Sequence, residues 1–573
     1  MKVRLSKCRL ALLFLLSMAV MACTANDEKR AMDLSAASDH CSGFSEFRLP
    51  HAVITQAQLV ASGDFVLYGS DFWIEYIGKN VNTDNLPAFC RVQAVAVPTQ
   101  DSHIKMEIWM PAKNWNGRYY QFAMGGAAGS LDYTMLVQRL SEGNAVATTD
   151  TGHMGKQLDW SWALGHSEKI IDFGYRAHKE TSDIAKAIVA QYYTRKPDYA
   201  YFFGCSRGGH AGLVSAQRYP DDWDGILVGA APADVTKELS NRLWRSLKWA
   251  QDPQGRIEPT KLTAIQRAAR ASCTAEAHMV KGIPADPRFC RYDPAILLCK
   301  GEETDACLTA PQIETLREIY DGQIDPITEK NQFRVPPTME AVNKVTAEYK
   351  AAFEKVAGRF SLEAGDARWV TNYGFSVEDF FRNVVFHDRE WDITKVKLDD
   401  MWSLAKDKMV AGEKLEDVLK ADIDWKALSK TNTKLMMYYG WADGFLSELG
   451  IEHYKKALDQ IGDEAKTQDF LRLFMVPGHC SRGPGAHIFG QYNRKVNDEP
   501  SHNIVRALEA WVEQGVAPEK LIATKYVDDF ILSSGKEVSF TRPLCVYPNV
   551  PVYIGQGSTK EAANFQYVKG ARP

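Results

Sequence analysis

The sequence predicts an α/β fold, because runs typical of β-strands alternate with a helical segment and because strand character returns late in the chain. Apolar runs of strand length lie at 92–97, 104–109, 119–122, 144–150, 199–203, 225–230, 434–440 and 471–476. A helical spacing of apolar residues occupies 182–193, between two of these runs. Alternation of this kind is typical of a sheet with helices on both faces.

The domain boundaries follow from the interval in which strand character is lost. The chain has 573 residues, of which 45% are hydrophobic, so it can bury a core large enough for more than one domain. We expect a signal peptide at 1–22, a mobile N-terminal stretch at 23–40, the α/β domain at 41–231 and 429–573, and an inserted lid domain at 232–428.

The charge of the chain excludes one class of partner. The net charge is -4, the sequence pI is near 6.4, and no long basic run interrupts the sequence. A nucleic-acid-binding protein needs a basic surface to neutralise phosphates, so we expect no nucleic-acid partner. A small, neutral or weakly charged substrate fits this composition better.

The N-terminus has the pattern of a secretory signal. Four basic residues within the first nine positions precede the apolar run Leu10–Val20, which is too short to span a bilayer comfortably. We therefore expect a secreted or periplasmic protein. Val20–Cys23 also resembles a bacterial lipobox; lipidation of Cys23 would make the protein an outer-membrane lipoprotein and is the one route by which we expect a membrane contact.

The elbow sequence Gly204-Cys205-Ser206-Arg207-Gly208 is the strongest chemical signal in the chain. A G-x-S-x-G run after an apolar strand predicts a sharp turn from strand to helix that exposes the serine hydroxyl. Ser206 is therefore the candidate nucleophile, and the expected fold is an α/β-hydrolase fold with a large inserted lid domain.

A serine nucleophile needs a base and an acid, which follow it in this fold in the order acid, then histidine. Asp443 comes just after the strand-like run that ends at Gly440, and His479 just after the run that ends at Val476. These positions predict the triad Ser206, Asp443 and His479. The alternative is that Asp443 is a turn residue and His479 a loop histidine.

Four other histidines are weaker candidates for the base. His210 lies on the same helix as Ser206 and points away from the hydroxyl, and His153 follows a strand end, where it could line the pocket. His453 and His502 fall in helical stretches, where we expect them to be solvated.

The cysteines suggest how the catalytic loops are joined. Of eleven cysteines, Cys8 and Cys23 belong to the signal peptide region, which leaves nine in the exported body; most should be paired and at least one unpaired. Cys205 precedes the nucleophile and Cys480 follows the base, so a disulfide between them would clamp the two catalytic loops together. The alternative is two buried thiols.

These residues together resemble a known family. Cys205-Ser206, Asp443 and His479-Cys480 are similar to the paired-cysteine motif of the tannase and feruloyl esterase family, which includes the mono(2-hydroxyethyl) terephthalate hydrolase. The likeness runs from about Cys41 to Phe565. Further matching blocks are Trp115–Arg118, Gly125–Gly126, Gly204–Gly209 and Pro543–Pro548.

The resemblance implies a secreted serine carboxylesterase that hydrolyses esters of hydroxycinnamic- or gallic-type aromatic acids through an acyl-enzyme, without a cofactor. It places the oxyanion hole at the backbone N–H groups of Gly126 and Arg207, in agreement with what acyl transfer needs. It also implies substrate contacts from Phe375 and Ser376 in the lid. The implied disulfides are Cys41–Cys90, Cys273–Cys290 and Cys299–Cys307.

The chain departs from the family at several positions. Tyr567 stands where a partner for Cys545 is expected, so we expect Cys545 to be unpaired. The acids of the family's calcium site are Thr274, Ala277 and Lys281 here, which predicts that no metal binds. The loop before His479 is two residues shorter than in the family.

Two further departures concern the substrate. Arg207 replaces the glutamate or threonine often found after the nucleophile and is expected to put a cation near the pocket rim. Thr371 replaces the arginine of the terephthalate branch, which argues against that substrate. The alternatives are an esterase for another small aromatic or polyketide-derived ester, or an inactive relative that binds aromatic ligands.

Overall fold

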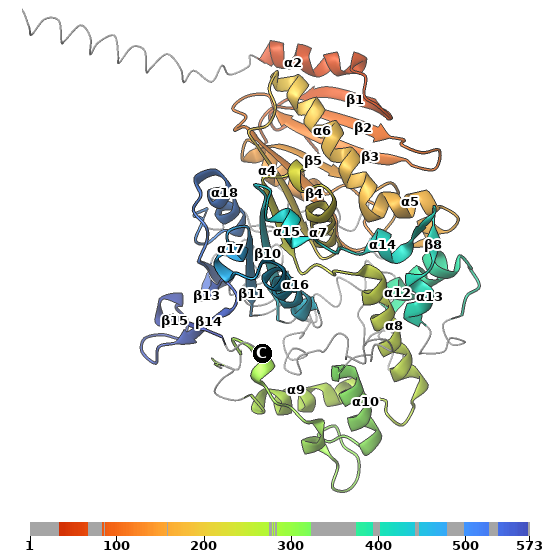
Figure 1. Ribbon diagram of the computed structural model, residues 1–573, viewed down its shortest axis with the longest axis vertical. Helices are drawn as coiled ribbons and strands as arrows, with labels where there is room; N and C mark the ends of the chain where they lie inside the picture. Colours follow the sequence, from red (N-terminus) through yellow and green to blue (C-terminus); the bar gives the residue numbers. More distant parts are fainter. Residues whose placement is uncertain are drawn as a thin grey trace, which may run out of the picture.

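A nine-stranded sheet forms the centre of the computed structural model (Figure 1). The structure describes residues 34–66, 83–84, 86–156, 159–273, 278, 280, 284–321, 374–392, 401–441, 446–477, 498–526 and 537–570. The strands of the sheet are β1 (Ala52–Val60), β2 (Phe89–Ala96), β3 (Ile104–Pro111), β4 (Arg118–Ala123), β5 (Ala145–Thr149), β6 (Tyr199–Cys205), β7 (Gly225–Gly229), β10 (Lys434–Gly440) and β11 (Leu471–Val476).

The strand order is β1-β2-β3-β5-β4-β6-β7-β10-β11. The pairs from β1 to β5 are antiparallel, and every pair from β5 to β11 is parallel. A mostly parallel sheet of this order is an α/β-hydrolase fold, as the sequence predicts. Because both faces are covered, the central strands are buried along most of their length, and every residue of β7 is buried.

In the described part of the chain, the helices that pack against this sheet include α4 (Tyr133–Ser141), α6 (Ala177–Tyr193), α7 (Arg207–Arg218), α16 (Leu446–Ile461) and α18 (Ile504–Gln514). The helix predicted at 182–193 is the second half of α6. The helix α2 (Leu34–Ser42) occupies the end of the stretch at 23–40 and buries Ala37, while the mobility expected of that stretch stays a prediction.

The described parts of the chain between β7 and β10 are mostly helices and loops, as expected for the insertion, with one short strand pair, β8 (Met409–Val410) and β9 (Glu413–Lys414). The exact lid boundaries stay a prediction. Its helices are α8 (Val235–Gln251), α9 (Leu262–Ala271), α10 (Ala310–Asp321), α12 (Gly374–Phe380), α13 (Met401–Lys406), α14 (Leu415–Leu419) and α15 (Trp425–Leu428). Helices α9 and α10 lie at the end of the molecule opposite α2 (Figure 1), around a small apolar core of their own.

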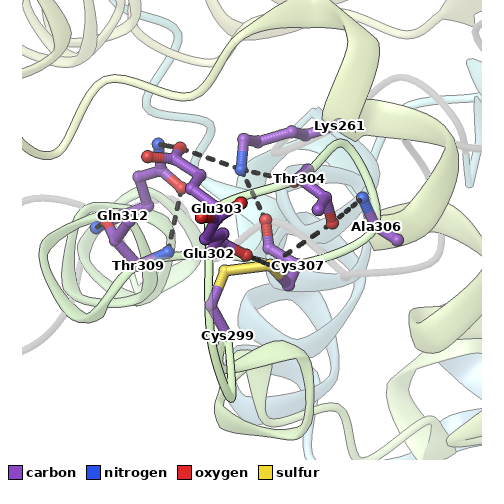
Figure 2. The surroundings of a disulfide bond; sticks show 9 residues. All are labelled: Lys261, Cys299, Glu302, Glu303, Thr304, Ala306, Cys307, Thr309 and Gln312. Carbon is purple, nitrogen blue, oxygen red and sulfur yellow. Dashed lines mark hydrogen bonds and ion pairs between the residues drawn. A yellow bond between two sulfur atoms is a disulfide. The ribbon is translucent and has the colours of Figure 1, made fainter.

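Among the described cysteines the structure forms three disulfides, which are the pairs that the family resemblance implies: Cys41–Cys90, Cys273–Cys290 and Cys299–Cys307. The last closes a short loop that Lys261 braces (Figure 2). The Lys261 ammonium donates to the Thr304 carbonyl at 2.9 Å and forms an ion pair with Glu303 at 2.9 Å.

The thiol of Cys545 is buried and forms no disulfide with any cysteine that the structure describes, and burial raises its pKa to about 12. In the part of the chain that the structure describes, no helix has the length and apolar character needed to cross a bilayer.

Candidate active site

Ser206 lies in a strained turn between β6 and α7. Its backbone has φ 58° and ψ -121°, a region that residues other than glycine rarely adopt. The Ser206 N–H donates to the Gly229 carbonyl at the end of β7 at 2.8 Å, and the His210 N–H donates to the Ser206 carbonyl at 2.9 Å. The strained conformation is therefore held from both sides, as a nucleophile elbow requires.

Two glycines of the elbow sequence are required by close backbone approach. A Cβ atom on Gly204 would lie 2.2 Å from the Gly208 carbonyl oxygen, and one on Gly208 would lie 2.1 Å from the Ala123 carbonyl oxygen. Real Cβ atoms essentially never come closer than 3.0 Å to such an atom. The first turn of α7 therefore packs directly on the end of β4, which no other residue type would allow.

The loop after β4, which carries the predicted oxyanion residue Gly126, lies against the elbow. A Cβ atom built on Gly125 would be 3.8 Å from the Ser206 Cβ and 3.5 Å from the Cys205 carbonyl oxygen, so this loop touches the elbow. Gly126 has φ 65°, a left-handed conformation that favours glycine. Arg207 is the first residue of α7, where backbone N–H groups have no partner within the helix.

The acid and base predicted from the sequence, Asp443 and His479, lie outside the described residues, as does Cys480. The strands before them are placed as the prediction needs. Gly229 pairs with Tyr438 in β10, and Gly440 pairs with Val476 at the end of β11. Because these strands are parallel to β6, the chain leaves β10 and β11 at the sheet edge that carries Ser206.

The side chain of Arg207 does not lie at a pocket rim, which corrects the expectation from the sequence. It is only 8% exposed, and its Nη2 forms an ion pair at 2.8 Å with the Oε2 of Glu238 in α8. Burial lowers the pKa of Arg207, whereas Glu238 acts to raise it. Burial would raise the pKa of Glu238, but Arg207 and Arg242 outweigh it and hold that pKa below its usual value.

His153 supports the loop after β4. Its ring stacks on Trp162 with centroids 3.7 Å apart, and its Nε2–H donates to the Ala127 carbonyl at 2.7 Å. Burial lowers the pKa of His153 to about 4, so the ring is neutral. Sequence reasoning left its role open, since only its place after a strand end marked it.

Three further histidines are buried behind the elbow, and this corrects the expectation that His453 is solvated. Burial lowers the pKa of His178 and His210 to about 4 and that of His453 to about 3. His210 turns its Nδ1 to the Pro232 carbonyl at 2.9 Å, away from the nucleophile as predicted. His502 is partly exposed, with 27% of its side chain accessible.

Aromatic side chains connect the elbow with the lid. The Arg207 guanidinium lies 5.8 Å from the ring centroid of Trp160, which packs edge-on against Phe380 of α12 at 5.1 Å. Phe375 and Ser376 belong to α12, but their side chains lie outside the described part, so their contact with a substrate stays a prediction.

The predicted loss of a calcium site concerns Thr274, Ala277 and Lys281, which also lie outside the described residues. Within the described ranges, no group of three or more His, Cys, Asp or Glu side chains is arranged to hold a metal ion.

Comparisons with known proteins agree with this geometry. A family model described as tannase and feruloyl esterase matches residues 90–568. An uncharacterized esterase of Xanthomonas campestris pv. campestris is 37% identical over 94% of this chain and 92% of its own length. A probable feruloyl esterase B-1 of Aspergillus fumigatus is 29% identical over 82% of this chain and 84% of its own.

Solved structures show the same fold at lower identity. The crystal structure of feruloyl esterase B from Aspergillus oryzae superposes with a TM-score of 0.77, at 23% identity, and covers 93% of this chain and 100% of its own. The tannin acyl hydrolase from Aspergillus niger gives a TM-score of 0.65 at 20% identity and covers 93% and 95%.

Proposed function

This chain belongs to the tannase and feruloyl esterase family and is a carboxylic ester hydrolase, and we propose that it is a secreted serine esterase for aromatic acid esters. The proposed substrates are esters of hydroxycinnamic- or gallic-type acids. The observation that carries this proposal is the strained Ser206 turn, with the glycine loop after β4 packed against it.

The reaction would proceed through an acyl-enzyme. The Ser206 hydroxyl attacks the ester carbonyl while His479 takes its proton, and Asp443 orients the imidazole and stabilises its charged form. The tetrahedral oxyanion is held by the N–H groups of Gly126 and Arg207. His479 then protonates the leaving alcohol, and the C–O bond breaks. Water, deprotonated by the same histidine, attacks the acyl-enzyme and releases the acid and Ser206.

A disulfide between Cys205 and Cys480 would hold the nucleophile and the base together in this scheme. Its support is that Cys205 ends β6 and that the chain leaves β11, which β7 and β10 separate from β6, at the same edge of the sheet. In the family resemblance, the lid residues Phe375 and Ser376 contact the acyl group, and α12, which carries them, packs on Trp160 beside the elbow.

Secretion is proposed from the basic and apolar N-terminus, and three disulfides fit an oxidising compartment. Mass determination of the mature N-terminus, after expression with the native leader, would test it. An intact Met1 would contradict secretion, and a lipid-modified Cys23 would identify a lipoprotein.

The enzymatic proposal is tested with methyl ferulate, methyl gallate and a p-nitrophenyl ester, using the parent protein and Ser206→Ala. We expect the parent to hydrolyse at least one aromatic methyl ester and the variant to lose 1,000-fold or more of that rate, roughly as in other serine triads. A fluorophosphonate probe should label the parent only. Equal rates in both proteins would refute the proposal.

A further inference from the structure

The residue after the nucleophile carries a buried charge. Arg207 follows Ser206 directly, and its side chain is 8% exposed, with the ring of Trp160 5.8 Å from the guanidinium. An uncompensated cation at such a place would be costly to bury and would act over a long range, because few water molecules are there to screen it. The identity of its counter-charge therefore matters for the chemistry at Ser206.

Glu238 supplies that counter-charge from another segment of the chain. Its carboxylate is 6% exposed and meets Arg207 at 2.8 Å through Oε2, while Oε1 accepts from Arg242 Nε at 2.8 Å. Glu238 lies in the first turn of α8, where the helix dipole favours a negative charge. The side chain of Asp234 caps the same turn by accepting from the Lys237 N–H at 2.9 Å.

The pair lies between the elbow and the helices of the lid. Helix α8 packs against α12 and α13, which Figure 1 shows beside it. The second terminal nitrogen of Arg207, Nη1, is buried and has no hydrogen-bond partner among the described residues. Glu238, in the ion pair at 2.8 Å, is the main negative charge that acts on this guanidinium, and Asp234 contributes less. Arg242, also bound to Glu238, is 17% exposed, and solvent screens its charge more strongly.

We propose that the Arg207–Glu238 ion pair determines substrate charge specificity: by cancelling the charge beside Ser206, Glu238 makes the site select uncharged aromatic acyl groups over acyl groups that carry a carboxylate. This inference rests on the proposed function, in which Ser206 is the nucleophile. Glu238 acts through Arg207 and touches no reacting atom, so it is a specificity-determining residue and not a catalytic one.

The test compares two esters of nearly equal shape, methyl 4-carbamoylbenzoate and the methyl half-ester of terephthalic acid, which differ in one charge. We expect the parent enzyme to prefer the neutral ester. Glu238→Gln leaves Arg207 uncompensated and should shift the kcat/KM ratio toward the anionic ester about tenfold, as expected for a charge roughly 10 Å away at an effective dielectric constant of about 20. Arg207→Gln should shift the ratio in the opposite direction.

The double variant Arg207→Gln/Glu238→Gln restores neutrality and should return the ratio to within about twofold of the parent; a purely structural role would predict additive damage instead. The matched control is Glu107→Gln. Glu107 lies in β3, away from the elbow, and is the buried ion-pair partner of Arg91 in β2. This variant should lower stability and leave the ratio unchanged.

Several outcomes would overturn the inference. One is an unchanged kcat/KM ratio in Glu238→Gln. Another is a shift of that ratio in the same direction in both single variants. The last is a parent enzyme that prefers the anionic ester or does not hydrolyse the neutral one. If Glu238→Gln does not fold, the kcat/KM ratios of Arg207→Gln and of the double variant decide whether the inference holds. Hydrolysis that survives in Ser206→Ala refutes the proposed function itself, whereas its loss there together with unchanged ratios refutes only this inference.

Discussion

The contact between the first turn of α7 and the end of β4 gives the sharpest test of how the site is built. In Gly208→Ala the new methyl group would start 2.1 Å from the Ala123 carbonyl oxygen, and it needs at least 3.0 Å. The difference is about 0.9 Å, and both atoms belong to packed segments, so the elbow and the Ala123–Gly126 loop must separate by nearly that distance.

A separation of this size should be costly for catalysis, because the loop carries one proposed oxyanion donor and the helix carries the other. A misplacement of about 1 Å can cost on the order of 100-fold in rate. We therefore expect Gly208→Ala to lower kcat for an aromatic methyl ester by about 100-fold, with KM changed little. The strain should also destabilise the protein by about 1–3 kcal/mol, partly offset by the better helix propensity of alanine.

The matched control is Gly212→Ala, one turn further along the same helix. There the added Cβ meets the Val228 Cγ2 at 2.9 Å, a methyl group and not a carbonyl. Both variants gain the same helix propensity, but only one pushes on the oxyanion loop. A folded Gly208→Ala that keeps kcat within threefold of the parent, or a Gly212→Ala that loses as much, would refute this reasoning.

Three other predictions concern the surroundings of the elbow. His153→Phe keeps an aromatic ring but loses the hydrogen bond to the Ala127 carbonyl, so kcat should fall about tenfold. Because His153 is not the catalytic base, the rate should fall at acid pH with the same apparent pKa as in the parent; a shift of that apparent pKa would contradict this assignment. Peptide mapping without reduction should join Cys205 to Cys480, and Cys480→Ser should destabilise the protein by on the order of 5 kcal/mol, whereas separate peptides would exclude the clamp. His453 has a pKa of about 3 when folded and about 6.5 when unfolded, so its neutral burial stabilises fully above pH 6.5 and less as the pH falls. Between pH 7.5 and 5, urea unfolding of the parent should therefore lose about 2 kcal/mol more than that of His453→Gln; equal losses would refute the assignment.

The central strands were predictable because their signal is local. Strands such as β7 and β10 are continuous apolar runs, and this is what burial on both faces of a parallel sheet requires. The edge strand β1 was not predicted, because its sequence has no continuous apolar run. Its burial alternates irregularly, four of its residues are exposed, and its sequence includes Thr55, Gln56 and Gln58, so periodicity alone does not distinguish it from a loop.

In the site, too, features that neighbouring residues determine were predictable, and features that distant residues determine were not. The turn at Ser206 was predictable because adjacent glycines produce it. The burial of Arg207 was not, since its partner Glu238 lies 31 positions later, on a helix whose place is set by tertiary packing. The burial of His453 was likewise missed, although a signal existed: His453 lies on the buried stripe of α16 with Leu449 and Ala457, and the exposed face carries Glu452, Lys455, Lys456 and Asp459.

Three separate segments fix the turn that presents Ser206, and each has its own attachment to the rest of the molecule. The end of β7 binds its N–H through Gly229, the loop after β4 packs on it and is held by His153, and α8 balances the charge of Arg207. The first two fix geometry, and geometry is common to any ester. Of these three segments, α8 contributes the charge. In the proposal above, the substrate range can therefore change through α8 without disturbing the turn.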